Sequence, residues 1–122
     1  MKKFSLTALA RQQLELAERA TSGRSAETVY GGHEHTLRQT VIALTAGATL
    51  AEHESPGEAT LQVLVGRVRL TADEDAWDGS PGDLLEIPRK RHALLALEAA
   101  AVLLTVVKTE AESRPKAADV PQ

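Results

Sequence analysis

The first part of the chain carries a helical pattern. Residues 5–20 place apolar side chains at intervals of three to four positions, the spacing of one face of an α-helix. Ser5 is a residue type that caps helix N-termini, and Gly23 is a typical helix breaker. We therefore expect residues 1–27 to form one short helix and a linker, and the helix either packs on the surface of the rest of the molecule or serves as a dimer contact.

From residue 28 the pattern changes to short apolar runs separated by turn residues, which is typical of an all-β sandwich or barrel. Gly66 between two runs suggests a tight hairpin, and residues 73–83 are expected to form a polar loop. Residues 28–108 should form the barrel, and residues 109–122 a mobile tail. Strands are expected at 36–44, 46–54, 59–65, 67–72, 84–88, 92–98 and 100–108.

The composition limits which residues can form the core and which partners the protein can bind. Hydrophobic residues make up 43% of the chain, enough for a core, but aromatics are only 2%, so the core must be built from Leu, Val, Ile and Ala. So few aromatics, with a net charge of −3, favour neither nucleic acid nor membrane partners. The absence of cysteine excludes disulfides and thiolate metal sites and fits a cytoplasmic location. No apolar run approaches the roughly 20 residues of a membrane helix.

Two stretches resemble the conserved motifs of the cupin superfamily. Residues 47–66 resemble the first motif, in which Gly is followed by five residues, His-x-His, three or four residues, Glu, six residues and Gly; Gly47, His53 and Gly66 occupy matching positions.

The second motif is Gly, five residues, Pro and a later His. Gly82, Pro88 and His92 match it within residues 82–92. The resemblance covers residues 36–108, and it implies a cupin-type antiparallel β-barrel, or jelly roll, with a short N-terminal helix in front.

Cupin metal sites typically use two His, one Glu and a later His, and the resemblance maps the first and last of these to His53 and His92. Ser55 stands at the second His position and Ala59 at the Glu position. Serine is a weak ligand and alanine offers none, whereas stable sites use three or four protein ligands. We therefore expect a degenerate metal site with no tightly bound cofactor.

Glu54, Glu58 or Gln62 could fill the missing ligand positions. Glu58 would turn inward if a one-residue bulge shifted its strand; without a bulge, Glu58 and Gln62 lie on the opposite face from Ala59. Gln39, if buried, needs a partner and would line a polar pocket. The candidate ligand-binding residues are thus His53, His92, Gln62 and Gln39, and the candidate ligands for Zn, Ni, Fe or Mn are His53 and His92 with Glu58.

Two further clusters have both a functional and a structural interpretation. His33 and His35 precede a strand and would contact a metal or ligand, or lie in an exposed loop. Residues 89–92 read Arg-Lys-Arg-His and would form an electropositive pocket mouth for an anion, or a solvated turn.

Three functions fit these features. The first is a small-molecule-binding cupin without enzymatic activity. The second is a metal-dependent cupin enzyme of the dioxygenase or isomerase kind, with substitute ligands. The third is an interaction or regulatory module. The sequence leaves enzymatic activity open. We expect a homodimer, because small barrels leave strand edges exposed and small cupins often dimerise.

Overall fold

The structure is a computed structural model that describes residues 2–53 and 57–107, apart from the side chains of Glu52 and His53. The expected tail therefore lies outside the described residues. Helix α1 (Leu6–Arg19) precedes the strands in the described part of the chain. The strands are β1 (Arg24–Tyr30), β2 (Leu37–Leu44), β3 (Thr49–His53), β4 (Glu58–Val65), β5 (Val68–Ala72), β6 (Asp75–Gly79), β7 (Leu84–Glu86), β8 (His92–Ala96) and β9 (Ala100–Val107).

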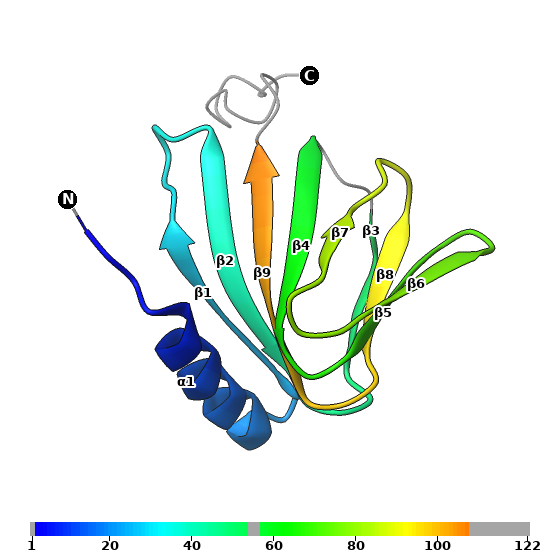
Figure 1. Cartoon of the computed structure of the whole chain (residues 1–122), viewed down its shortest axis with the longest axis horizontal. Coiled ribbons are helices and arrows are strands. Elements are labelled where there is room, and N and C mark those ends of the chain that lie inside the picture. Colours follow the sequence, from blue (N-terminus) through cyan, green and yellow to red (C-terminus); the bar gives the residue numbers. More distant parts are fainter. Residues whose placement is uncertain (1, 54–56, 108–122) are drawn as a thin grey trace, which may run out of the picture.

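The strands form two antiparallel sheets that pack face to face (Figure 1). The five-stranded sheet has the order β1-β2-β9-β4-β7, and the four-stranded sheet has the order β3-β8-β5-β6. Neighbours in space are mostly not neighbours in sequence, so the chain crosses repeatedly between the sheets. This arrangement confirms the predicted jelly-roll barrel.

The core lies between the two sheets and is aliphatic, as the composition predicts. Along β4, burial alternates so that Ala59, Leu61 and Val63 face the core. The three aromatic side chains, by contrast, are all exposed: Phe4, Tyr30 and Trp77. The barrel interior therefore offers a ligand aliphatic contacts and no described aromatic surface.

Helix α1 begins where predicted, with the Ser5 Oγ accepting a hydrogen bond from the Ala8 N–H at 3.1 Å. The helix lies against β1, β2 and β9, on the outer face of the five-stranded sheet (Figure 1). Its buried residues are Ala10, Gln13 and Ala17. Among the described residues, no helix is long and apolar enough to cross a membrane.

The turn at Gly66 is not the predicted hairpin, because β4 and β5 belong to different sheets. Gly66 has φ +78°, and a Cβ built on it would lie 2.1 Å from the Ala99 carbonyl oxygen. The glycine thus allows the chain to pass another backbone segment closely as it turns from one sheet to the other.

Two strands lie where the sequence pattern indicates none. β1 begins at Arg24, inside the segment expected to be a linker, and β6 occupies much of the expected loop 73–83. Both strands are at sheet edges and mostly exposed, so their apolar alternation is weak. The β5–β6 hairpin turns at Asp73, which has φ +54°.

Candidate functional site

His92, the first residue of β8, is a buried histidine of the barrel, with 5% of its surface exposed. Its Nδ1 lies 2.9 Å from the Lys90 carbonyl oxygen. Because a carbonyl oxygen can only accept, Nδ1 donates, and this hydrogen bond fixes both the tautomer and the ring orientation.

The His92 ring borders a cavity of about 40 Å³ inside the barrel. That space suffices for little more than a water molecule or a methyl-sized group, and it is far smaller than the roughly 300–1,000 Å³ of typical ligand pockets. The other lining residues are aliphatic: Ile42, Leu50, Leu61, Leu70, Ile87, Leu94 and Leu104. Among its lining residues, His92 is thus the polar side chain at the edge of an otherwise aliphatic cavity.

The backbone brings the two motif histidines together. His53 of β3 is the direct antiparallel partner of His92 on β8, after an irregularity in the register that follows Leu50. The Cα atoms of such partners are typically about 4.5–5.5 Å apart. The side chain of His53 lies outside the described part of the structure, as do all of Glu54 and Ser55.

Ala59 occupies an inward-facing position on β4 and is buried. Its carbonyl oxygen accepts a hydrogen bond from the Ile87 N–H at 3.1 Å. The position where cupins typically carry a glutamate thus faces the barrel interior in this chain, but it supplies a methyl group.

Glu58 does not turn inward, because β4 pairs with β9 in unbroken register from Glu58 to Val63 and has no bulge there. It is exposed on the outer face of the five-stranded sheet, which corrects the interpretation of Glu58 as an inward ligand. Gln62 lies half-buried on the same outer face. Among the described side chains, no three His, Asp or Glu residues come together as a metal-binding group.

Gln39 also points away from His92. Its Nε2 donates a hydrogen bond to the Thr105 Oγ1 on neighbouring β9 at 3.2 Å. Gln39 is three positions from the inward-facing Ile42 and therefore lies on the outer face of β2. The structure thus separates Gln39 and Gln62 from His92 by the thickness of a sheet, and their role in ligand binding stays a prediction.

The second histidine pair lies in the loop that joins β1 and β2. His35 packs edge-on against the Tyr30 ring, with the ring centroids 4.9 Å apart. His33 is exposed and borders an open cleft with Thr28, Gly31, Gly32 and Arg38. The two histidines therefore have different surroundings, and the sequence pattern does not reveal the cleft beside His33.

The cationic segment at residues 89–91 joins β7 to β8. Lys90 Nζ forms an ion pair with the Asp73 carboxylate at 3.2 Å, which offsets part of its charge. Arg89 borders a second open cleft, together with residues 58–60 and 86–88.

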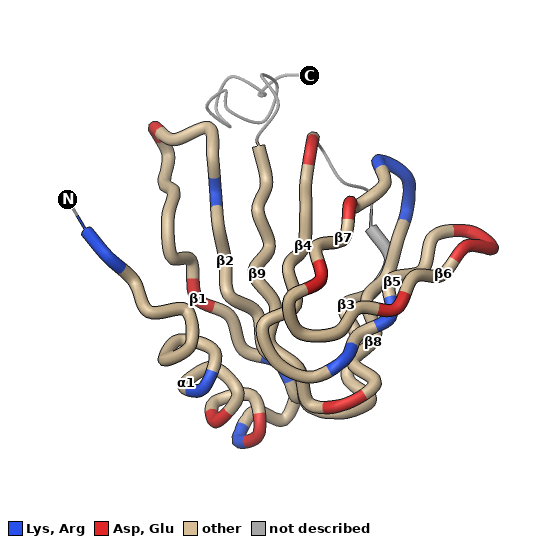
Figure 2. The backbone as a smooth tube through the Cα atoms, in the orientation of Figure 1, with Lys and Arg blue, Asp and Glu red and all other residues tan. Residues whose placement is uncertain are grey.

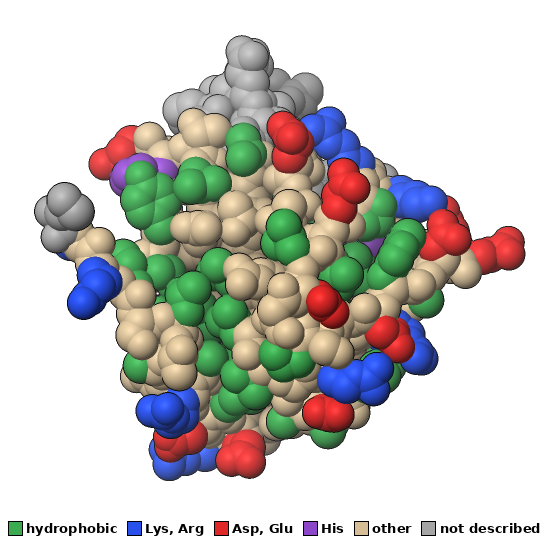
Figure 3. Space-filling view, in the orientation of Figure 1, with side chains coloured by type: hydrophobic (Ala, Val, Ile, Leu, Met, Phe, Trp, Pro, Cys, Tyr) green, Lys and Arg blue, Asp and Glu red, His purple; other side chains and the backbone are tan. Residues whose placement is uncertain are grey.

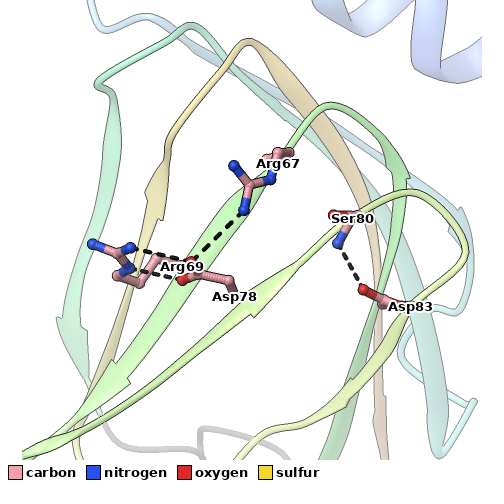
Figure 4. Close-up of polar contacts among 5 residues, drawn as sticks. All are labelled: Arg67, Arg69, Asp78, Ser80 and Asp83. Carbon is pink, nitrogen blue, oxygen red and sulfur yellow. Dashed lines mark hydrogen bonds and ion pairs between the residues drawn. The ribbon is translucent and has the colours of Figure 1, made fainter.

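A separate charge cluster lies on the four-stranded sheet (Figure 4). Arg69 Nε donates to one Asp78 carboxylate oxygen at 2.7 Å and its Nη2 to the other at 3.1 Å, while Arg67 lies 3.8 Å away. The hydrogen bond from Arg69 lowers the pKa of Asp78 below its usual value. All three side chains are exposed on β5, β6 or the turn before β5, and the Arg69–Asp78 pair links the two strands of this edge hairpin.

Solved structures of cupins have a fold similar to that of this chain. A cupin superfamily protein from Desulfitobacterium hafniense aligns with a TM-score of 0.65 at 20% identity, covering 70% of this chain and 78% of that one. An RmlC-like cupin from Shewanella frigidimarina aligns with a TM-score of 0.64 at 17% identity, covering 73% and 79% of the two chains.

The chain has the cupin fold. A conserved protein of unknown function from Streptococcus pyogenes is similar over more of the chain, with a TM-score of 0.69, 28% identity and 89% of each chain covered. No protein-family model and no curated protein matches the sequence of this chain. The comparisons thus support the barrel fold, and its function must be inferred from the side chains described above.

Proposed function

We propose that this cupin binds a small molecule at the open end of its barrel and carries no resident metal ion there. The observation that supports this most directly is Ala59, an apolar residue at an inward-facing position where a cupin metal site typically has its carboxylate. His92, held by the Lys90 carbonyl, then serves as a polar recognition group beside an aliphatic cavity.

The size of the cavity limits how a ligand would sit. About 40 Å³ admits one small apolar group of a ligand, so most of the molecule would lie outside, at the mouth of the barrel. His92 is the first residue of β8 and follows the loop from β7. It would contact the ligand between the cavity and the mouth of the barrel. We infer a ligand with one small apolar group and a hydrogen-bonding group next to it.

A thermal-shift screen tests this proposal. A ligand that binds only the folded protein stabilises it by RT ln(1 + [L]/Kd), about 2.7 kcal/mol at a hundred times Kd. We expect ligands that raise the melting temperature of the wild type to lose their effect in His92→Ala and in His92→Phe, which keeps the volume filled. Val41→Ala, a destabilising change at a buried position on the outer face of the five-stranded sheet, should keep the effect. Ligand shifts that persist in both His92 variants would contradict the proposal.

A metal-dependent cupin enzyme is the second candidate, and the register that pairs His53 with His92 favours it. Two imidazoles on neighbouring strands would be half of a four-ligand site. Such an enzyme would need further ligands, and Glu58 on the outer face cannot supply one without a change in the register of β4. Metal content separates this candidate from a metal-free binding protein. An interaction module remains the third, if no ligand is found.

A further inference from the structure

We propose that the cleft lined by Thr28, Gly31, Gly32, His33 and Arg38 is a binding site for the oxyanion group, carboxylate or phosphate, of a small molecule. We call it the Arg38 cleft. Its volume is about 390 Å³, within the range of small-molecule sites, and it lies at the end of the β1–β2 hairpin. This site goes beyond the function proposed for the barrel and does not require the cavity at His92 to be occupied.

The hairpin brings the donor groups to one face. Thr28 of β1 is paired with Thr40 of β2, and Arg38 is two positions from Thr40, so all three share a face. A shift in register between Thr28 and Tyr30 interrupts the ladder immediately afterwards. Irregularities of this kind re-aim neighbouring side chains, which is common next to binding sites.

Gly31 determines where Arg38 can lie. It has φ +129°, and a Cβ built on it would lie 3.1 Å from both Cα and Cγ of Arg38. The side-chain stem of Arg38 therefore rests against a turn that only glycine can form without strain or crowding. This close approach holds the stem of Arg38 against Gly31, and both residues line the cleft.

The charge of Arg38 has no partner in the described part of the chain. The three ion pairs found there involve Arg67, Arg69 and Lys90 instead. No described hydrogen bond uses the side chain of Arg38, Thr28 or His33. An unpaired guanidinium matches the geometry of a carboxylate or phosphate, and a threonine hydroxyl and an imidazole beside it add donors.

Two observations favour the Arg38 cleft as an anion site. Lys90 in the cationic loop at residues 89–91 is already paired with Asp73. In the β1–β2 loop, Glu34 is exposed and does not line the Arg38 cleft. The cleft is also separate from the cavity at His92: Arg38 and Ile42 share a face of β2 but lie four positions, roughly 13 Å, apart.

The test is an NMR titration of the full-length protein with inorganic phosphate, and then with acetate, at constant ionic strength. We expect saturable shifts of the Gly31, Gly32 and His33 amides. Arg38→Gln should weaken phosphate binding at least tenfold. Arg89→Gln removes the same charge from the other loop and should leave the affinity within twofold. Gly31→Ala, checked for folding in the same spectra, should weaken binding as well because it displaces Arg38.

Four results would overturn the inference. The first is the absence of saturable shifts at these amides in the wild type. The second is unchanged phosphate affinity in Arg38→Gln. The third is an equal loss in Arg38→Gln and Arg89→Gln, which would show nonspecific attraction. Phosphate binding that needs His92 instead of Arg38 would also overturn it while leaving the proposal for the barrel intact; His92→Phe should therefore retain the shifts.

Discussion

At the scale of single residues, two glycines with similar backbone angles have different surroundings. Gly66 has φ +78° and Gly47 has φ +86°, so both adopt a conformation that L side chains disfavour. A Cβ at Gly66 would overlap the Ala99 carbonyl oxygen, whereas a Cβ at Gly47 would meet nothing within 4 Å. Backbone conformation and steric crowding can therefore be separated in one protein.

We predict that Gly47→Ala lowers the free energy of unfolding by about 1–2 kcal/mol, the cost of a left-handed conformation. Gly66→Ala should cost at least about 2 kcal/mol more, because the backbone at Ala99 must also move. Urea denaturation of both variants measures the difference. Equal losses would show that the close approach at Gly66 does not affect the free energy of unfolding.

The ion pair between Asp78 and Arg69 predicts a dependence of stability on pH. The Arg69 hydrogen bond lowers the pKa of Asp78 in the folded state. A lowered pKa stabilises the fold at pH values above the unfolded value, about 3.9, and this contribution disappears as the pH falls through the folded value. We expect Asp78→Asn to be slightly less stable than the wild type at pH 5–7 and equally stable at the acidic end of the transition, as measured by urea denaturation.

Asp75→Asn is the matched control for Asp78→Asn. Asp75 lies on the same strand, and its side chain has no ion-pair partner among the described residues. The substitution changes the net charge equally and should show no such pH-dependent difference. Added salt should also reduce the effect of Asp78→Asn, because the pair is exposed. A difference that is constant down to pH 2 would contradict the assigned cause.

At the scale of elements, a buried glutamine attaches α1 to the barrel. Gln13 is 2% exposed; its Nε2 donates to the Glu27 carboxylate at 3.1 Å, and its Oε1 accepts from the Ser25 hydroxyl. Both partners belong to β1, an edge strand of the five-stranded sheet. The helix is thus held to the sheet by polar contacts as well as by the small residues Ala10 and Ala17.

We predict that Gln13→Ala lowers the free energy of unfolding by about 1–3 kcal/mol, because it removes two hydrogen bonds and leaves Ser25 and Glu27 without this partner. Gln12→Ala is the control, since Gln12 is exposed on the same helix and should change stability by less than about 0.5 kcal/mol. Thermal or urea unfolding measures both. Similar effects would mean that the contacts of Gln13 do not hold α1 in place.

The sequence predicts well those elements whose burial leaves a pattern. Helix α1 has an apolar face, and β2 and β9 have continuous apolar runs, because each of these elements is largely buried. The edge strands β1 and β6 have no such pattern, because most of their side chains are exposed. The topology at Gly66 could not be read locally either, because a glycine marks a turn but not which sheet the chain enters next.

The same distinction applies to the candidate site: features that leave a pattern in the sequence were predictable, and the others were not. The motif spacing predicts that His53 and His92 lie close together, and the strand register pairs their backbones. Strand alternation without a bulge correctly places Glu58 and Gln62 on the opposite face from Ala59. The Arg38 cleft is built from a turn, an interrupted ladder and a close backbone contact, which leave no periodic signal. The burial of Gln13 was open to prediction, since it lies at helical spacing between Ala10 and Ala17.

At the scale of the whole molecule, α1 covers only one end of the outer face of the five-stranded sheet (Figure 1). Elsewhere on this sheet, large apolar side chains remain exposed, and Leu84 on β7 reaches 64%. Charged residues lie mainly around this surface, and β9 carries none (Figure 2). The space-filling view shows the resulting uncharged area over the sheet (Figure 3). An uncharged centre with a charged border is the usual anatomy of a protein interface.

We propose that a second copy of the chain covers this surface, and we predict a homodimer. Its apolar residues are Tyr30, Leu37, Leu84 and Val107. Light scattering after gel filtration should give a dimer mass at micromolar concentration, and the double variant Leu37→Asp with Leu84→Asp should be a monomer. Trp77→Ser, which removes an exposed apolar side chain from β6, should remain a dimer. A monomeric wild type would contradict the proposal.

The metal content of the purified protein decides most directly between a binding barrel and a metal-dependent enzyme. We would incubate the full-length protein with zinc, nickel, iron or manganese salts, desalt it and count ions by elemental mass spectrometry. We expect far less than one divalent ion per chain, because Ala59 supplies no ligand and Glu58 faces outward. One ion per chain in the wild type, retained in His33→Ala and lost in His92→Ala, would contradict the proposal of a metal-free binding barrel.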